Sequence, residues 1–156
     1  MDTINGDILD IPAGTIVQQV NCQGVMGAGL AKQIRARWPI VFSYYTEFLE
    51  LCKEFNVEPH GQAIVVNVGE DDEGYVTKAV AMLFAQDGYG GGHRWTQYDW
   101  FRSSLRSLVN NMDVAVPLPL YIPVGIGCGL GGGDWDTIRG IIEEEAPDAI
   151  LVKRGA

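Results

Sequence analysis

Residues 14–37 read GTIVQQVNCQGVMGAGLAKQIRAR, and this stretch decides the fold. Its first part, residues 14–21, is rich in β-branched residues and opens with a glycine, which is typical of a strand. A glycine-rich loop follows in residues 24–29, and residues 30–37 predict a short helix that ends before Pro39. A strand, a loop and a helix in this order predict the first unit of an α/β fold.

The alternation of strands and helices continues along the rest of the chain. Apolar residues recur at helical spacing in residues 41–55, 98–109 and 134–145, and short β-branched or apolar runs predict strands at residues 3–7, 63–68, 76–84, 118–123 and 149–153. This order predicts a layered α/β fold around a mixed or largely parallel sheet. Ligands of such sheets bind beyond the carboxyl ends of the strands, which directs attention to the loops after Val20, Phe84 and Pro123.

The composition suits one globular domain that does not bind nucleic acid broadly. A length of 156 residues fits a single domain, and the apolar fraction of 47% argues against disorder. The net charge is −9, from 11 basic and 20 acidic residues, and no basic run is longer than a pair. Proteins that hold the nucleic-acid backbone need a basic face. Backbone N–H groups can still hold one small anion without a lysine.

The cysteines and the first residues indicate where the protein works. Cys22, Cys52 and Cys128 follow neither a disulfide framework nor the close Cys/His spacing of a zinc site. We therefore expect a reducing compartment, with no metal ion and no cofactor. The first residues lack a secretory signal, and no apolar run approaches the ~20 residues that span a membrane. The protein is expected to be cytoplasmic, without membrane partners.

Residues 21–31, NCQGVMGAGLA, form the first candidate binding loop. Glycine permits close approach of the backbone, and N–H groups at a helix start attract a phosphate. Asn21 stands at the predicted strand end, where its amide can both donate and accept. The same loop could also be a tight turn without a ligand, and it lacks the glycine spacing of a dinucleotide fingerprint.

Residues 123–135, PVGIGCGLGGGDW, form the second candidate loop. Six of the nine residues 125–133 are glycine, and the others are apolar residues at alternate positions. This pattern predicts one face anchored in the core and another that offers N–H groups. Cys128 is interpreted as a small buried residue rather than a nucleophile. Asp134 could cap the next helix, contribute to chemistry, or do both.

Two shorter segments add further candidates. Asp7, in residues 5–8 (NGDI), could accept a hydrogen bond from an exocyclic amine such as that of adenine, or could serve in a turn or cap. His93 lies in residues 84–95, a glycine- and aromatic-rich segment that could cover a ligand. It could act as an acid or base near neutral pH, although a plain surface histidine is more common. His60, in a Pro-His-Gly turn, is interpreted as structural.

Together these segments resemble the macrodomain family, whose members bind ADP-ribose. The similarity covers nearly all of residues 1–156 and rests on N-C-x-G-x-M-G-x-G-[IL]-A followed by G-x-G-C-G-L. It implies a single macrodomain with a three-layer α/β/α fold and a central mixed, largely parallel sheet. It also implies ADP-ribose or ADP-ribose-1''-phosphate as the ligand, and it leaves the oligomeric state open.

The resemblance assigns a part of the ligand to each segment. Asp7 in residues 5–8 is similar to the family residue that meets the adenine amine. Residues 21–31 are similar to the loop beside the distal ribose, and residues 125–130 are similar to the loop that wraps the diphosphate. The ligand-binding residues expected on this basis are Asp7, Ile8, Asn21, Gly27, Ala28, Gly29, Phe84, Gly125, Ile126, Gly127, Cys128, Gly129 and Leu130.

The match is closest to the branch with the terminal ADP-ribose protein glycohydrolase, the DNA-directed antitoxin macrodomain and the yeast-type ADP-ribose-1''-phosphate phosphatases. The first two use a lysine just after the strand that here ends at Phe84, where residues 85–87 read AQD. The protein glycohydrolase adds an aspartate at a position that Gly131 occupies here. Residues 84–90, followed by residues 98–99, look more like the phosphatases.

The leading hypothesis is therefore an enzyme that hydrolyses ADP-ribose-1''-phosphate to ADP-ribose and phosphate. The two glycine-rich loops would hold the phosphates, and Asn21 would orient the distal ribose and the attacking water. Asp134 is the first candidate for the acid or base, and His93 is the second. The alternatives are a module that binds ADP-ribose without turnover, and a glycohydrolase that acts on modified protein or nucleic acid without the usual lysine.

Overall fold

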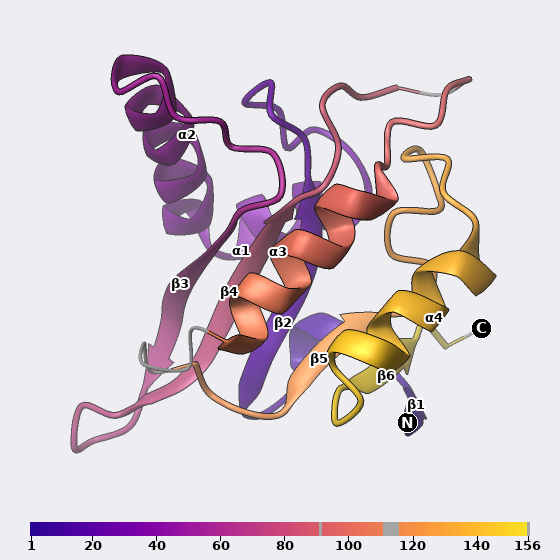
Figure 1. The fold of residues 1–156 in the computed structure, drawn as a ribbon. Coiled ribbons are helices and arrows are strands. Elements are labelled where there is room, and N and C mark those ends of the chain that lie inside the picture. The colour runs from indigo at the N-terminus through magenta and orange to yellow at the C-terminus, as the bar shows by residue number, and fades with distance from the viewer. Residues whose placement is uncertain (91, 111–115, 156) are drawn as a thin grey trace.

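The computed structural model describes residues 1–90, 92–110 and 116–155, and the ribbon of this part of the chain forms three layers (Figure 1). Its strands make one six-stranded sheet with the order β1-β6-β5-β2-β4-β3. The strands are β1 (Thr3–Asn5), β2 (Gly14–Val20), β3 (Ala63–Glu70), β4 (Val76–Phe84), β5 (Leu120–Pro123) and β6 (Ile150–Lys153). Only β3 runs antiparallel to its neighbour in this sheet, so the predicted mixed, largely parallel sheet is confirmed.

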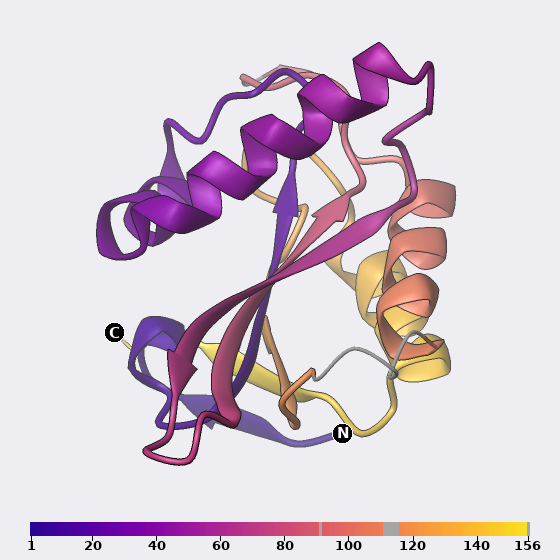
Figure 2. The ribbon, with the colours of Figure 1, turned by 90° about the vertical axis from the view of Figure 1, so that its left-hand side faces the viewer.

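Helices cover both faces of the sheet (Figures 1 and 2). The described helices are α1 (Gly29–Arg37), α2 (Pro39–Glu54), α3 (Tyr98–Asn110), α4 (Trp135–Glu145) and the short 3-10 helix η1 (Ile8–Asp10). One buried cluster joins the sheet to η1, α1 and α2, and the other joins it to α3 and α4. The three-layer α/β/α architecture is thus confirmed. None of the helices in the described part is both long and apolar enough to cross a membrane.

The central strand β2 shows why the sequence folds in this way. Ile16 and Val20 face the cluster under α1 and α2, whereas Val17 faces the cluster under α3 and α4, as the two-residue period of a strand requires. β2 pairs in parallel with β4 on one side and with β5 on the other. The carboxyl ends of these three strands therefore lie at one edge of the sheet.

The sheet differs from the sequence prediction mainly at its margins. Residues 8–10 form η1, which was not predicted, and β1 is only three residues long. β3 continues to Glu70 through a bulge between Asn67 and Gly69. α2 begins at Pro39, whose fixed φ and missing N–H suit the first turn of a helix.

Candidate functional site

Three cavities join into one cleft beyond the carboxyl ends of β2, β4 and β5. The proximal cavity (about 200 Å³) is lined by Asp7, the central cavity (about 300 Å³) by both glycine-rich loops, and the distal cavity (about 360 Å³) by Asn21. The proximal and central cavities share Gly29 and Pro123, and the central and distal cavities share Gln86. The shared walls make the cleft continuous, and it lies where α/β sheets bind ligands.

The two glycine-rich loops, residues 21–28 and 124–134, form the walls of the central cavity. Among the hydrogen bonds of the described residues, none engages the N–H groups of Ala28, Gly127 or Gly129, all of which line this cavity. The first loop also leads into the N-terminus of α1, where the helix dipole is positive. Free N–H groups and a helix N-terminus make the central cavity suitable for an anion.

Close packing demands glycine at several positions of the second loop, among them Gly127 and Gly131. Gly127 has a φ of +74°, and a Cβ atom there would lie 2.8 Å from Gln19 Oε1. A Cβ atom at Gly131 would lie 2.6 Å from Thr96 Oγ1 and 2.7 Å from the carbonyl oxygen of residue 127. Position 131, where the family glycohydrolase carries an aspartate, has no room for a side chain in this structure.

Polar side chains under the second loop reach the central cavity. Gln19 Nε2 donates to Gln86 Oε1 (2.7 Å) and to Thr96 Oγ1 (2.8 Å), and the Thr96 hydroxyl donates to the carbonyl oxygen of Gly127 (2.7 Å). Gln19 Oε1 and both side-chain amide atoms of Gln18 are buried and have no hydrogen-bond partner among the described residues. Both glutamines line the cavity, and buried orphan polar atoms at such a position favour a polar ligand or ordered water.

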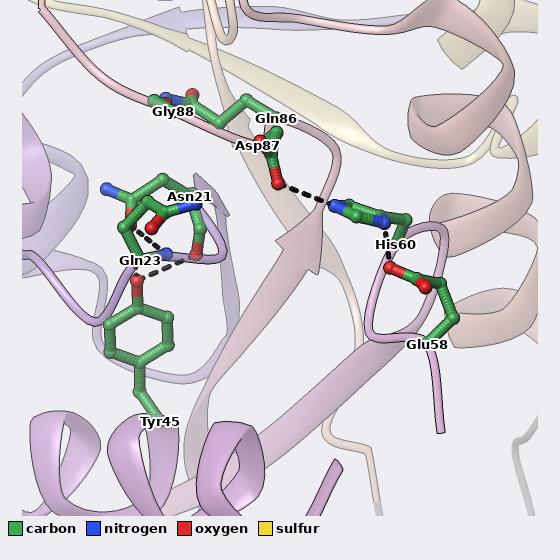
Figure 3. A network of polar contacts seen from close by, with 8 residues as sticks. All are labelled: Asn21, Gln23, Tyr45, Glu58, His60, Gln86, Asp87 and Gly88. Atoms are coloured by element: carbon green, nitrogen blue, oxygen red, sulfur yellow. Dashed lines mark hydrogen bonds and ion pairs between the residues drawn. The ribbon is translucent and has the colours of Figure 1, made fainter. Parts of the chain in front are cut away.

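Asn21 lies at the end of β2, lines the distal cavity and holds the first loop in place (Figure 3). Its Oδ1 accepts hydrogen bonds from the Tyr45 hydroxyl (2.7 Å) and from the N–H of Gln23 (2.9 Å), and its Nδ2 donates to the carbonyl oxygen of Val25 (2.7 Å). A second hydrogen on Nδ2 remains available for a ligand. The structure therefore places Asn21 in the cleft with its amide already oriented.

Asp7 lines the proximal cavity together with Ile8. Its Oδ1 accepts the N–H of Leu9 (2.9 Å) and caps η1, which leaves Oδ2 without a hydrogen-bond partner in the described part of the chain. The cap role and a ligand role are thus compatible. The side chain of Ile8 is buried in the core, so a ligand can reach this residue only through its backbone.

The structure does not bring the two acid/base candidates into the cleft. Asp134 is the N-cap of α4, where its Oδ2 accepts from the Thr137 hydroxyl (2.8 Å) and N–H (3.0 Å). These two hydrogen bonds lower the pKa of its carboxyl group. His93 is exposed, and its ring centroid lies 5.1 Å from that of Trp95. Neither residue is among the described residues that line the three cavities.

Phe84 is a correction to the expected ligand contacts. Its side chain is 0% exposed, and its ring packs against Phe48 (4.9 Å between centroids) and Tyr45 (5.9 Å). Its backbone N–H and carbonyl are bonded to Gln62 and Gly61. Phe84 is therefore part of the core and has no group free for a ligand.

The cysteines at the two loops are not activated nucleophiles. Burial, followed by the negative charges of Asp87 and Glu58, raises the pKa of the Cys22 thiol to about 12. Burial and the charge of Asp134 raise the pKa of the Cys128 thiol to about 11. Both thiols are protonated at neutral pH, which agrees with the interpretation of Cys128 as a small packing residue.

The distal cavity holds no strong acid or base among its described lining residues. Residues 85–87 (AQD) stand where the family lysine is expected, and the side chains of Gln86 and Tyr89 line this cavity. Lys78 is engaged elsewhere, since its Nζ donates to the carbonyl oxygen of Leu9 (2.8 Å). Gln86 and Tyr89 belong to residues 84–95, the segment that was expected to cover a ligand. Gln18 was not singled out from the sequence, although a polar residue within an otherwise apolar strand is a signal for it.

The fold is shared with known proteins, although no family model matches the chain. The structure is similar to the macrodomain of Mycobacterium tuberculosis DarG, with a TM-score of 0.74 and 23% identity over 99% of this chain and 97% of that chain. This chain has the macrodomain fold. The structure is also similar to that of Thermosipho africanus DarTG in complex with ADP-ribose, with a TM-score of 0.76 and 19% identity over 99% of this chain and 42% of that chain.

Part of this sequence is similar to two kinds of curated protein. It is 38% identical over 68 residues to a DNA ADP-ribosyl glycohydrolase of Mycobacterium tuberculosis, covering 44% of this chain and 18% of that protein. It is 35% identical over 74 residues to an ADP-ribose 1''-phosphate phosphatase of Scheffersomyces stipitis, covering 43% of this chain and 41% of that protein. The match thus spans less than half the length of either relative.

Proposed function

We propose that this macrodomain binds ADP-ribose in the cleft and hydrolyses ADP-ribose-1''-phosphate to ADP-ribose and phosphate. The observation that carries the proposal is the row of three joined cavities with unengaged N–H groups in its centre. In ADP-ribose, a nucleoside, a diphosphate and a second ribose are connected in a linear order that matches the order of the three cavities. The macrodomain fold and the similarity to a phosphatase and a glycohydrolase of ADP-ribose derivatives support this choice of ligand.

Each cavity suits one part of such a ligand. The free Oδ2 of Asp7 accepts a hydrogen bond from the exocyclic amine of adenine in the proximal cavity. The N–H groups of Ala28, Gly127 and Gly129 donate to the diphosphate in the central cavity, so the net charge of −9 is offset locally. In the distal cavity, the remaining Nδ2 hydrogen of Asn21 orients the second ribose.

Hydrolysis in this cleft depends on positioning rather than on a strong base. Water attacks the phosphorus atom, the bond to the ribose oxygen breaks, and one proton passes from the water to the solvent as the leaving oxygen gains another. Phosphoryl transfer draws mainly on orientation and charge stabilisation, which oriented N–H groups supply. Because no carboxylate, histidine or lysine lines the distal cavity in the described residues, we expect a slow enzyme.

A second candidate function is a reader that binds ADP-ribose without turnover. The observation that favours it is the same lack of a strong acid or base in the distal cavity. A lysine-dependent glycohydrolase is disfavoured, because residues 85–87 read AQD where its lysine is expected and a Cβ atom at position 131 would lie 2.6 Å from Thr96 Oγ1.

The decisive experiment is an NMR time course of the protein with ADP-ribose-1''-phosphate, accompanied by calorimetric titration with ADP-ribose. We expect the phosphomonoester signal to disappear, and Asn21→Ala to slow its loss. Saturable ADP-ribose binding without phosphate release would reject the phosphatase and favour the reader. Release of ADP-ribose from modified protein or DNA would instead establish a glycohydrolase.

A further inference from the structure

A second polar cluster lies beside the distal cavity, where the loops after β2 and β4 meet the turn before β3. Cys22 follows Asn21, Asp87 follows Gln86, and His60 lies in the turn before β3. One ligand atom of Cys22, one of His60 and one of Asp87 lie within 4.8 Å of one another. The three residues are far apart in sequence, so the local Cys/His spacing that reveals many zinc sites could not show this cluster.

We propose that Cys22, His60 and Asp87 form a binding site for one zinc ion. Thiolate, imidazole and carboxylate are the usual protein ligands of Zn²⁺. A thiolate makes Mg²⁺ and Ca²⁺ unsuitable, because both prefer oxygen ligands. Zinc–ligand bonds of roughly 2.0–2.3 Å place ligand atoms about 3–4 Å apart, so the three groups need only a small movement to close around an ion.

Neighbouring side chains hold the imidazole of His60 in a suitable orientation (Figure 3). Its Nδ1 pairs with the carboxylate of Glu58, and its Nε2 lies 2.9 Å from Asp87 Oδ1. The ring also stacks on Trp100, with 4.1 Å between centroids and an angle of 17° between planes. A metal-bound histidine commonly donates its other ring N–H to a carboxylate, which fixes its tautomer. Glu58 is placed for this role, and Nε2 is left to face the ion.

The other two ligands are tied together through the backbone. The N–H of Cys22 donates to the carbonyl oxygen of Asp87 (3.1 Å), so a backbone hydrogen bond joins the loops after β2 and β4 at the cluster. A cavity of about 540 Å³ beside α2 is also lined by Cys22. Water or a small molecule would supply the fourth ligand of a tetrahedral zinc ion. Binding releases the thiol proton of Cys22 to solvent as the zinc–sulfur bond forms, and it needs no oxidant or reductant.

A nucleophilic Cys-His-Asp triad is the other arrangement that these residue types suggest. It would require one imidazole nitrogen to accept the proton of Cys22 while the other faces an acid. Both nitrogens of His60 already face carboxylates, those of Glu58 and Asp87. A cation between the thiolate, the imidazole and the carboxylate fits this geometry better.

The test is a titration of the chelator-treated full chain with Zn²⁺, in competition with a chromogenic chelator. We expect one zinc ion per chain. Glu58→Gln should weaken binding by about 10- to 100-fold, as for other carboxylates that orient a metal-bound histidine. Cys22→Ser and His60→Gln should lose more than about 100-fold, since they remove ligands directly. Cys128→Ser removes a half-buried cysteine outside the cluster and should leave the affinity unchanged.

Cobalt provides a spectroscopic check that a merely structural ion pair would not pass. Co²⁺ bound to the wild type should show a thiolate-to-metal charge-transfer band, and Cys22→Ser should lose the band. Far-ultraviolet circular dichroism of the metal-free variants establishes that each one folds. If Cys22→Ser or His60→Gln does not fold, Asp87→Asn replaces it as the variant that removes a ligand. No stoichiometric zinc binding, or binding that persists unchanged in both Cys22→Ser and His60→Gln, would overturn the proposal.

Discussion

Adding a negative charge at Gly27 should weaken ADP-ribose binding without disturbing the fold. Gly27 is exposed and lines the distal cavity. A Cβ atom there would have Val25 Cγ1, at 3.6 Å, as its nearest neighbour, which is an ordinary contact. Gly127→Glu is a poorer test, because a Cβ atom at that position would lie 2.8 Å from Gln19 Oε1 and would strain the loop.

The size of the loss in ADP-ribose affinity follows from the repulsion between the Gly27→Glu carboxylate and the phosphates of the ligand. At about 5 Å and an effective dielectric constant of about 20, two like charges repel by about 3 kcal/mol. Solvent screening at an exposed position reduces this energy by up to about half. The expected loss of affinity is therefore roughly 10- to 100-fold.

Isothermal titration calorimetry with ADP-ribose measures this loss directly. Gly27→Gln is the matched control, since it adds the same bulk without the charge, and we expect it to retain most of the affinity. The loss in Gly27→Glu should also shrink as salt is added. Equal affinity of the glutamate and glutamine variants would refute the electrostatic reasoning, and unchanged affinity in both would mean that the phosphates bind elsewhere.

Four further outcomes test the roles of single residues. Asp7→Ala should weaken ADP-ribose more than ribose 5-phosphate in calorimetry, because only ADP-ribose carries adenine; equal losses would contradict the adenine contact. Gln18→Met should lower ADP-ribose affinity by about tenfold while leaving the melting temperature unchanged or higher, since it removes buried polar atoms that lack partners. Asp134→Asn should retain both the helix cap and turnover, whereas a loss of turnover of about 100-fold or more would make Asp134 the acid or base. Hydrogen bonds from two arginines lower the pKa of Glu145 from 4.5 to about 2, so its stabilising effect is present above about pH 4.5 and is lost as the pH falls toward about 2. Acid melting curves of Glu145→Gln should lose that part of the pH dependence, and curves parallel to the wild type would show that the pairing is without effect.

The architecture was predictable from sequence because local and long-range signals agree. Strands such as β2 and β4 are bounded by glycine or turn residues, and the helices carry an apolar face at regular spacing. The two glycine-rich loops could be found for the same reason, since only glycine fits a position such as Gly127. The three residues of η1 are too short to leave a periodic pattern, so this element was not predicted.

The individual site residues were harder to predict, because exposure depends on tertiary packing. Phe84 follows the pattern of a strand end beside a ligand, yet its ring is enclosed by aromatic residues of α2. The acid Asp134 is the last residue of the second loop, but its Oδ2 accepts the N–H of Thr137 in α4. Cys22 and His60 are 38 positions apart, and only the folded sheet brings them to the same corner.

The two margins of the sheet have a consequence for contacts between copies of this protein. An open strand edge exposes unpaired backbone groups that can template pairing with another chain. Here β1 is three residues long, and β3 is bent by the bulge between Asn67 and Gly69. Neither margin therefore offers a long flat ladder, and the fold resists edge-to-edge aggregation.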